Sequence, residues 1–279
     1  MLAASELKNS GQHEATMATA VSGRASKASK TGMAPEEWER RVDLAAAYRL
    51  VHLFGWSDLI GTHLTARVPG PGDQFLINPY GFLFEEITAS CLVKVDVEGN
   101  ILSETEHHIN PAGFVIHSAV HMARPDAACC IHTHTPAGVS VATQKAGLQP
   151  LTQHALAVIA STAYHDYAGI SMDRAERESI ARDLGTNNVL FLRNHGLLTV
   201  GRTTAEAFVW MYRAERACRM QLALQQSGAV LAPIPEEVQR VTLERNRFNN
   251  SEKGYRPIGK HEWPALLRRL DRESPGYRE

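Results

Sequence analysis

Apolar residues follow a helical spacing in several stretches of the chain, and these stretches begin and end at residues typical of helix boundaries. The first begins at Pro35 with Glu36 and Glu37 in its first turn, where proline and acidic side chains are favoured. The longest has an apolar face between Thr203 and Gly228. The pattern predicts helices over residues 35–54, 111–123, 136–146, 173–184 and 204–227, with a docked terminal helix near residues 262–270.

Shorter apolar or alternating runs, separated by Pro, Gly and Asn, predict strands. Residues 93–97 and 101–102 flank Glu-Gly-Asn and favour a hairpin. The other expected strands cover residues 63–68, 75–77, 127–132, 189–192 and 197–200. Helices therefore alternate with strands, and the sequence predicts an α/β fold in which an antiparallel sheet begins near residue 63.

The domain limits follow from composition. Residues 1–33 are rich in Ser, Thr, Ala, Lys and Gly and are expected to be a flexible N-terminal tail. Residues 34–232 contain the patterned elements and are expected to form one domain, and residues 233–279 form a polar C-terminal extension. A mitochondrial transit peptide is the alternative for the tail, but Glu6 and Glu14 and the shortage of Arg argue against it.

Charge and cysteine content narrow the function classes. The net charge is −1 and the pI about 6.9, so neither nucleic acid nor a membrane surface is expected as a partner. No apolar run approaches the roughly 18–20 residues that span a bilayer. The four cysteines are few for a disulfide framework, and a reducing compartment, the cytoplasm, is expected.

Three histidines form the strongest chemical signal. His132 and His134 are two residues apart at the end of an apolar strand, so their side chains point to the same face. His195 has a matching place after the apolar run 189–192. Three imidazoles suit zinc, iron, copper or nickel and leave a coordination position open for water or substrate. A chain with 13 histidines can also contain such a pair by chance, but the strand-end context favours a metal site.

Motifs along the chain resemble the class II aldolase/adducin family, which joins metal-dependent sugar-phosphate aldolases and epimerases with the head domains of the cytoskeletal adducins. The resemblance implies an α/β/α sandwich around a mainly antiparallel central sheet. It also implies a homotetramer, a small-molecule substrate and one divalent metal ion held by the three histidines, with zinc first and iron(II) or manganese as alternatives. The matching segments are residues 55–60, 63–67, 78–81, 110–118, 123–126, 132–134 and 193–197.

The chain departs from the family pattern where the aldolases carry their acid/base carboxylate. The glutamate position, four residues before His117, is Gly113, which can neither transfer a proton nor bind a metal. Positions associated with phosphate recognition hold Pro111 and Ala112, and His63 replaces an asparagine. A phosphate would lose hydrogen-bond donors here, so the expected substrate is not phosphorylated.

Other residues are candidates for the missing chemistry and for substrate binding. His117 is the better candidate base, and Tyr164, in a Tyr-His-Asp-Tyr run, is a second catalytic candidate. His63, Tyr80, Gly81 and Phe114 are the candidate substrate-binding residues. Tyr80, Phe114 and the neighbouring Phe82 favour a larger, more apolar or aromatic substrate, although packing in the core explains such aromatic residues equally well.

Three functions follow. The first is a metal-dependent lyase, of the aldolase or decarboxylase type, acting on a non-phosphorylated hydroxy-carbonyl compound. The second is a non-haem iron(II) oxygenase that performs oxidative decarboxylation or cleavage without a carboxylate base. The third is a non-catalytic adducin-like scaffold, against which the intact histidines count. The lyase is the favoured hypothesis.

Overall fold

A computed structural model describes residues 33–167, 169 and 174–279 of the chain. Seven strands form one sheet in the order β3-β2-β1-β4-β7-β6-β5. Neighbouring strands are antiparallel except β5 and β6, which are parallel, so the mainly antiparallel α/β fold is confirmed. The strands are β1 (Leu64–Arg67), β2 (Phe75–Ile77), β3 (Val93–Val95), β4 (Cys129–Thr133), β5 (Thr162–His165), β6 (Val189–Leu192) and β7 (Gly196–Gly201).

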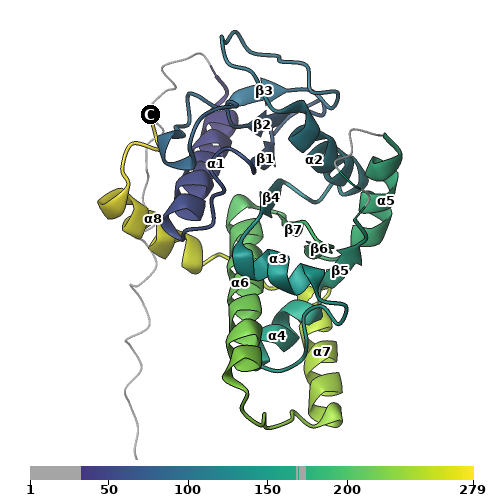
Figure 1. The fold of residues 1–279 in the computed structure, drawn as a ribbon. Coiled ribbons are helices and arrows are strands. Elements are labelled where there is room, and N and C mark those ends of the chain that lie inside the picture. The colour runs from purple at the N-terminus through teal and green to yellow at the C-terminus, as the bar shows by residue number, and fades with distance from the viewer. Residues whose placement is uncertain (1–32, 168, 170–173) are drawn as a thin grey trace, which may run out of the picture.

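Helices cover both faces of the sheet, with α1, α3, α4 and α6 on one side and α2 and α5 on the other (Figure 1). The predicted tail lies outside the described residues except for Met33, as does the predicted helix start at Asp173. The helices are α1 (Pro35–Leu53), α2 (Pro111–Ala123), α3 (Pro136–Thr143), α4 (Gln153–Ile159), α5 (Arg174–Leu184), α6 (Thr204–Ser227), α7 (Glu236–Asn250) and α8 (Glu262–Glu273), with a short 3₁₀ turn, η1 (Phe84–Glu86).

Local signals in the sequence account for the ends of α6. The Thr203 side chain accepts a hydrogen bond from the Glu206 backbone N–H, and the Glu206 carboxylate accepts one from the Arg202 backbone N–H, so orphan donors of the first turn are satisfied. At the other end Gly228 adopts a left-handed conformation with φ 62°, which glycine tolerates without steric cost. The predicted helix is thus confirmed at both boundaries.

The C-terminal extension returns to the main domain through α8. Trp263 and Leu270 of α8 are buried, and the Trp263 indole N–H donates to the Asp43 carboxylate of α1 at 3.0 Å. This confirms the predicted docked terminal helix. By contrast, α7 packs beside α4 with no fully buried residue of its own.

The alternation of side chains along β4 determines to which face of the sheet His132 points. Cys129 and Ile131 face the core cluster beneath α1 and α6, whereas Cys130 faces the cluster beneath α2 and α5. His132 has the same parity as Cys130, so it points to the α2 side of the sheet. Because β4 lies between β1 and β7, residues from both neighbouring strands surround it.

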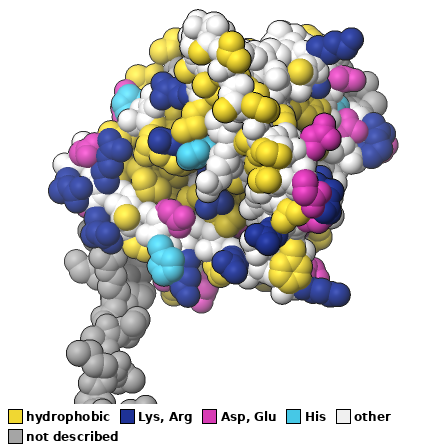
Figure 2. Space-filling view, turned by 90° about the horizontal axis from the view of Figure 1, so that it is seen from below, with side chains coloured by type: hydrophobic (Ala, Val, Ile, Leu, Met, Phe, Trp, Pro, Cys, Tyr) yellow, Lys and Arg dark blue, Asp and Glu magenta, His cyan; other side chains and the backbone are white. Residues whose placement is uncertain are grey.

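The surface and the cysteines agree with the composition. Basic and acidic side chains are interspersed on the face shown in Figure 2. All four cysteines are free thiols. Over the described residues, no helix has both the length and the apolar character that a membrane crossing requires.

Candidate metal centre

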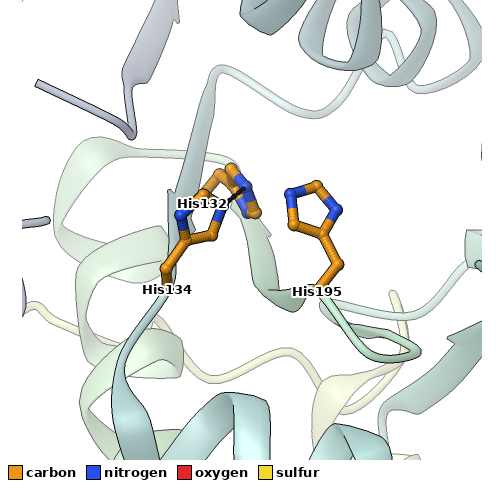
Figure 3. Close-up of side chains that lie close together, drawn as sticks. All are labelled: His132, His134 and His195. Atoms are coloured by element: carbon orange, nitrogen blue, oxygen red, sulfur yellow. Dashed lines mark hydrogen bonds between the residues drawn. The ribbon is translucent and has the colours of Figure 1, made fainter. Parts of the chain in front are cut away.

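The structure brings the three predicted metal ligands together at one end of β4 (Figure 3). His132 belongs to β4, His134 follows its last residue, and His195 lies in the turn between β6 and β7. The ring centroids are 4.7 Å apart for His132 and His134, 4.8 Å for His132 and His195, and 4.9 Å for His134 and His195. One potential ligand atom from each ring lies within 4.8 Å of the others.

The turn that carries His195 has two features that fix its position. Asn194 has a positive φ of 59°, a conformation that asparagine adopts more readily than most residues. A Cβ on Gly196 would lie 2.4 Å from the Thr133 carbonyl oxygen, so only glycine allows β7 to approach the end of β4 this closely. The backbone therefore determines how near His195 comes to His134.

Hydrogen bonds fix which ring nitrogens carry protons. His132 Nδ1 lies 2.9 Å from the Leu197 carbonyl oxygen and His134 Nδ1 lies 3.0 Å from Asp58 Oδ2, so both Nδ1 atoms donate. In neutral rings, each Nε2 then has a lone pair. These two Nε2 atoms face each other at 2.9 Å. Two lone pairs that face each other at this distance suit a cation bound between them.

Burial keeps the rings of His132 and His195 in the neutral form that binds metal. It lowers the pKa of His132 well below the usual value, with help from the neighbouring His195 and His134. It also lowers the pKa of His195 to about 4. The other ring nitrogens of His132 and His134 donate to a carbonyl and a carboxylate, which orients these two rings as metal ligands. Together with His195 they form a set of three imidazoles, which fits a divalent ion with an open coordination position.

His63 occupies the space where a side chain at position 113 would lie. Gly113 is in the first turn of α2, and a Cβ there would lie 2.7 Å from both Cε1 and Nδ1 of His63. The His63 ring is buried, and its centroid lies 5.8 Å from that of His132. Burial lowers the pKa of His63 to about 4, and a backbone hydrogen bond with Gly113 opposes this shift. Both residues were singled out from the sequence, but their contact was not foreseen.

His117 is held by a chain of buried hydrogen bonds. His121 Nδ1 donates to the Ala127 carbonyl at 2.9 Å, so the neutral ring accepts at Nε2 from the Thr65 hydroxyl at 2.8 Å. The Thr65 oxygen is then an acceptor for His117 Nδ1–H at 2.8 Å. Burial lowers the pKa of His117 well below its usual value and that of His121 to about 3. His117 is therefore neutral with a lone pair on Nε2, and its ring lies 4.1 Å from that of His63.

Other candidates from the sequence have different surroundings. Phe114 is 2 % exposed and belongs to a core cluster, where it contacts Phe75. Tyr80 is 51 % exposed, and its backbone N–H donates to the His108 carbonyl. Gly81, with φ 97°, follows it in a turn.

Tyr164 makes contacts that hold a loop. Its hydroxyl accepts a hydrogen bond from the Leu148 backbone N–H at 2.9 Å, its ring stacks on Phe191, and the Arg193 guanidinium lies 4.2 Å above the ring centroid. The structure thus brings His63 and His117 near the histidine triad. Tyr164 instead contacts Leu148, Phe191 and Arg193.

Two residues of the site were missed from the sequence. Asp58 orients His134, and the signal for it was its carboxylate within the Gly-Trp-Ser-Asp segment that carries part of the family resemblance. Thr65 joins His117 to His121, and nothing in its local sequence points to that role. Tyr167, which is 53 % exposed, has its ring 6.5 Å from that of His195.

Comparison with known proteins finds consistent similarity. Residues 42–222 match the family model described as Class II Aldolase and Adducin N-terminal domain. The crystal structure of an aldolase II superfamily protein from Pseudomonas syringae is 47% identical with a TM-score of 0.82, covering 88% of this chain and 98% of that one. L-fuculose 1-phosphate aldolase from Glaciozyma antarctica is 29% identical with a TM-score of 0.73, covering 88% and 94%. Alpha-adducin of Mus musculus is 42% identical over 255 residues, which are 85% of this chain and 33% of adducin.

Proposed function

Because the chain belongs to the class II aldolase and adducin family, we propose that it is a metal-dependent lyase that cleaves or decarboxylates a non-phosphorylated hydroxy-carbonyl compound. The observation that carries the proposal is the pair of facing Nε2 atoms of His132 and His134, 2.9 Å apart, with both Nδ1 protons committed elsewhere. This arrangement suits a divalent cation, with His195 as the third ligand. Zinc is the first candidate and iron(II) or manganese the alternatives.

The protein's own residues have separate roles in this proposal. His132, His134 and His195 hold the ion, and the Leu197 carbonyl and Asp58 orient two of the rings. When bound, the ion would polarise the substrate carbonyl and stabilise the negative charge that develops on its oxygen. Since position 113 has no carboxylate and no room for one, proton transfer depends on a group other than the residue at that position.

The absence of a phosphate from the substrate follows from the groups near Gly113. A phosphate dianion is bound by cations or by several hydrogen-bond donors. Pro111 and Gly113 offer no side-chain donor, and His63 is neutral because burial lowers its pKa to about 4. These features support a non-phosphorylated hydroxy-carbonyl substrate over a sugar phosphate.

Metal-dependent turnover tests the proposal. Protein stripped with a chelator and reloaded with zinc is assayed for aldehyde release from hydroxy ketones and for CO2 release from 2-hydroxy-3-keto acids. We expect activity that requires the metal and is abolished in His132→Ala. The matched control is His52→Ala, which removes a surface histidine, 43% exposed and paired with Glu85. Turnover that needs iron(II) and consumes oxygen would replace the lyase with the oxygenase.

A non-catalytic scaffold is the alternative supported by the similarity to alpha-adducin. Protein that binds no divalent metal would favour the scaffold over both enzymes. We also propose a homotetramer, in keeping with the family resemblance. Light scattering should then give about four times the chain mass of 30.7 kDa.

A further inference from the structure

Two buried ring nitrogens beside the metal centre have no hydrogen-bond partner. They are His63 Nε2 and His117 Nε2. Both rings are buried, they lie 4.1 Å apart, and the His63 ring is 5.8 Å from that of the metal ligand His132. Buried polar atoms in folded proteins are nearly always paired, so two unpaired nitrogens side by side indicate a site for a polar group that binds there.

The hydrogen bonds of the two rings determine what kind of group fits. His117 donates through Nδ1 to Thr65, so its Nε2 has a lone pair. His63 Nε2 is the other unpartnered nitrogen, and in a neutral ring it either carries a proton or has a lone pair. A group that fits must therefore donate to His117 Nε2, and one that can both donate and accept also suits His63.

We propose that His63 and His117 form a subsite that binds a neutral hydroxyl group of the substrate, with His117 Nε2 accepting the hydroxyl proton. The inference rests on the proposed function, because it concerns a hydroxyl of a compound whose carbonyl lies at the three-histidine site. A hydroxyl supplies the proton that the lone pair of His117 needs, and its oxygen can accept a hydrogen bond from His63 Nε2. A carboxylate has no proton to donate at neutral pH and would repel that lone pair.

The surroundings of the subsite keep its two rings in place. Gly113 leaves room for the His63 ring and is in contact with it, with three ring atoms within 3.2 Å of the Cβ that glycine lacks. Thr65 and His121 fix the orientation of His117 from the other side. A fixed pair of rings discriminates between a ligand with a hydroxyl and one without it more strongly than a flexible pair would.

Two small ketones form a matched pair of probes. Hydroxyacetone has a carbonyl and a hydroxyl, whereas methoxyacetone replaces the hydroxyl proton with a methyl group. Nitrogen NMR of the histidine-labelled, zinc-loaded protein should show an unprotonated Nε2 on His117. Hydroxyacetone should shift this signal in the direction of an accepted hydrogen bond and also change the Nε2 signal of His63, whereas methoxyacetone should leave the His117 signal in place. This measurement uses the unaltered protein and needs no turnover.

Ligand affinities of a His63 variant test the same hydroxyl subsite. Hydroxyacetone should bind about tenfold more tightly than methoxyacetone, the difference expected for one good hydrogen bond. His63→Phe should abolish that difference while the protein keeps its zinc, and the control His52→Phe should retain it. A protonated Nε2 on His117, or equal effects of the two ketones on its nitrogen signal, would overturn the inference. Zinc content reports on the proposed function separately, because the nitrogen spectra can also be recorded on metal-free protein.

Discussion

Replacing Gly113 with alanine tests the contact between this residue and His63. The added Cβ would lie 2.7 Å from Cε1 and Nδ1 of His63 and 3.2 Å from its Nε2. The His63 ring cannot move away easily, because it is buried between Gly113 and His117. Gly113 lies within α2, so the substitution by itself favours the helix. Steric conflict and helix propensity therefore act in opposite directions.

Whether Gly113→Ala raises or lowers the free energy of unfolding depends on the residue at position 63. Overpacking a buried site costs about 1–3 kcal/mol, and replacing glycine by alanine inside a helix gains about 1 kcal/mol. Gly113→Ala should therefore lower the free energy of unfolding by about 1 kcal/mol in the natural sequence, and by about 2 kcal/mol at most. In a His63→Ala background the conflict is absent, and the same substitution should stabilise by up to about 1 kcal/mol.

Urea unfolding of four metal-free proteins measures this coupling: the natural chain, the two single variants and the double variant. The interaction energy between positions 63 and 113 should be about 2 kcal/mol. As a control, Gly113→Ala combined with His165→Ala should be additive, because His165 pairs with Asp183 on α5, whereas the atoms nearest to a Cβ at position 113 belong to His63. If Gly113→Ala has the same effect with and without His63, the described contact is wrong.

Three further predictions concern the metal centre and its histidines. His132→Ala should retain no zinc after gel filtration, as measured by elemental analysis, whereas His52→Ala should retain as much as the natural protein. Asp58→Asn removes the carboxylate that orients His134 and should weaken zinc affinity about 10–100-fold in a chelator competition; unchanged affinity would show that Asp58 plays no part. The metal-free protein should lose stability as the pH falls from 6.5 to 4, because the unfolded chain takes up protons near 6.5 that His63 takes up only near 4. This shift corresponds to about 3 kcal/mol for His63 alone, and urea unfolding at pH 7 and pH 4.5 should give a smaller loss in His63→Phe.

The triad could be predicted because each ligand follows from local pattern. Two histidines with one residue between them share a face of any strand, and the apolar run before them indicated a strand. His195 lies between two apolar runs that form the β6–β7 hairpin. Strand pairing then determines the convergence, since β4 and β7 are neighbours in the sheet.

The rest of the site depends on contacts between distant positions. His63 and Gly113 meet only because β1 pairs with β4 and α2 packs across them. Phe114, one residue beyond Gly113, points away from His63 into a core cluster, since successive helical residues are about 100° apart. The sequence pattern could therefore suggest that His63 and Phe114 either contact the substrate or pack in the core. It could not show which of the two residues does which.

The metal itself is the most direct test of the account. Elemental analysis and X-ray absorption of the zinc-loaded natural protein should give one zinc ion per chain, bound by three imidazole nitrogens at roughly 2.0–2.1 Å. His132→Ala should show neither the stoichiometry nor the imidazole scattering. A natural protein that binds no more zinc than this variant would contradict the assignment of His132, His134 and His195 as a metal centre.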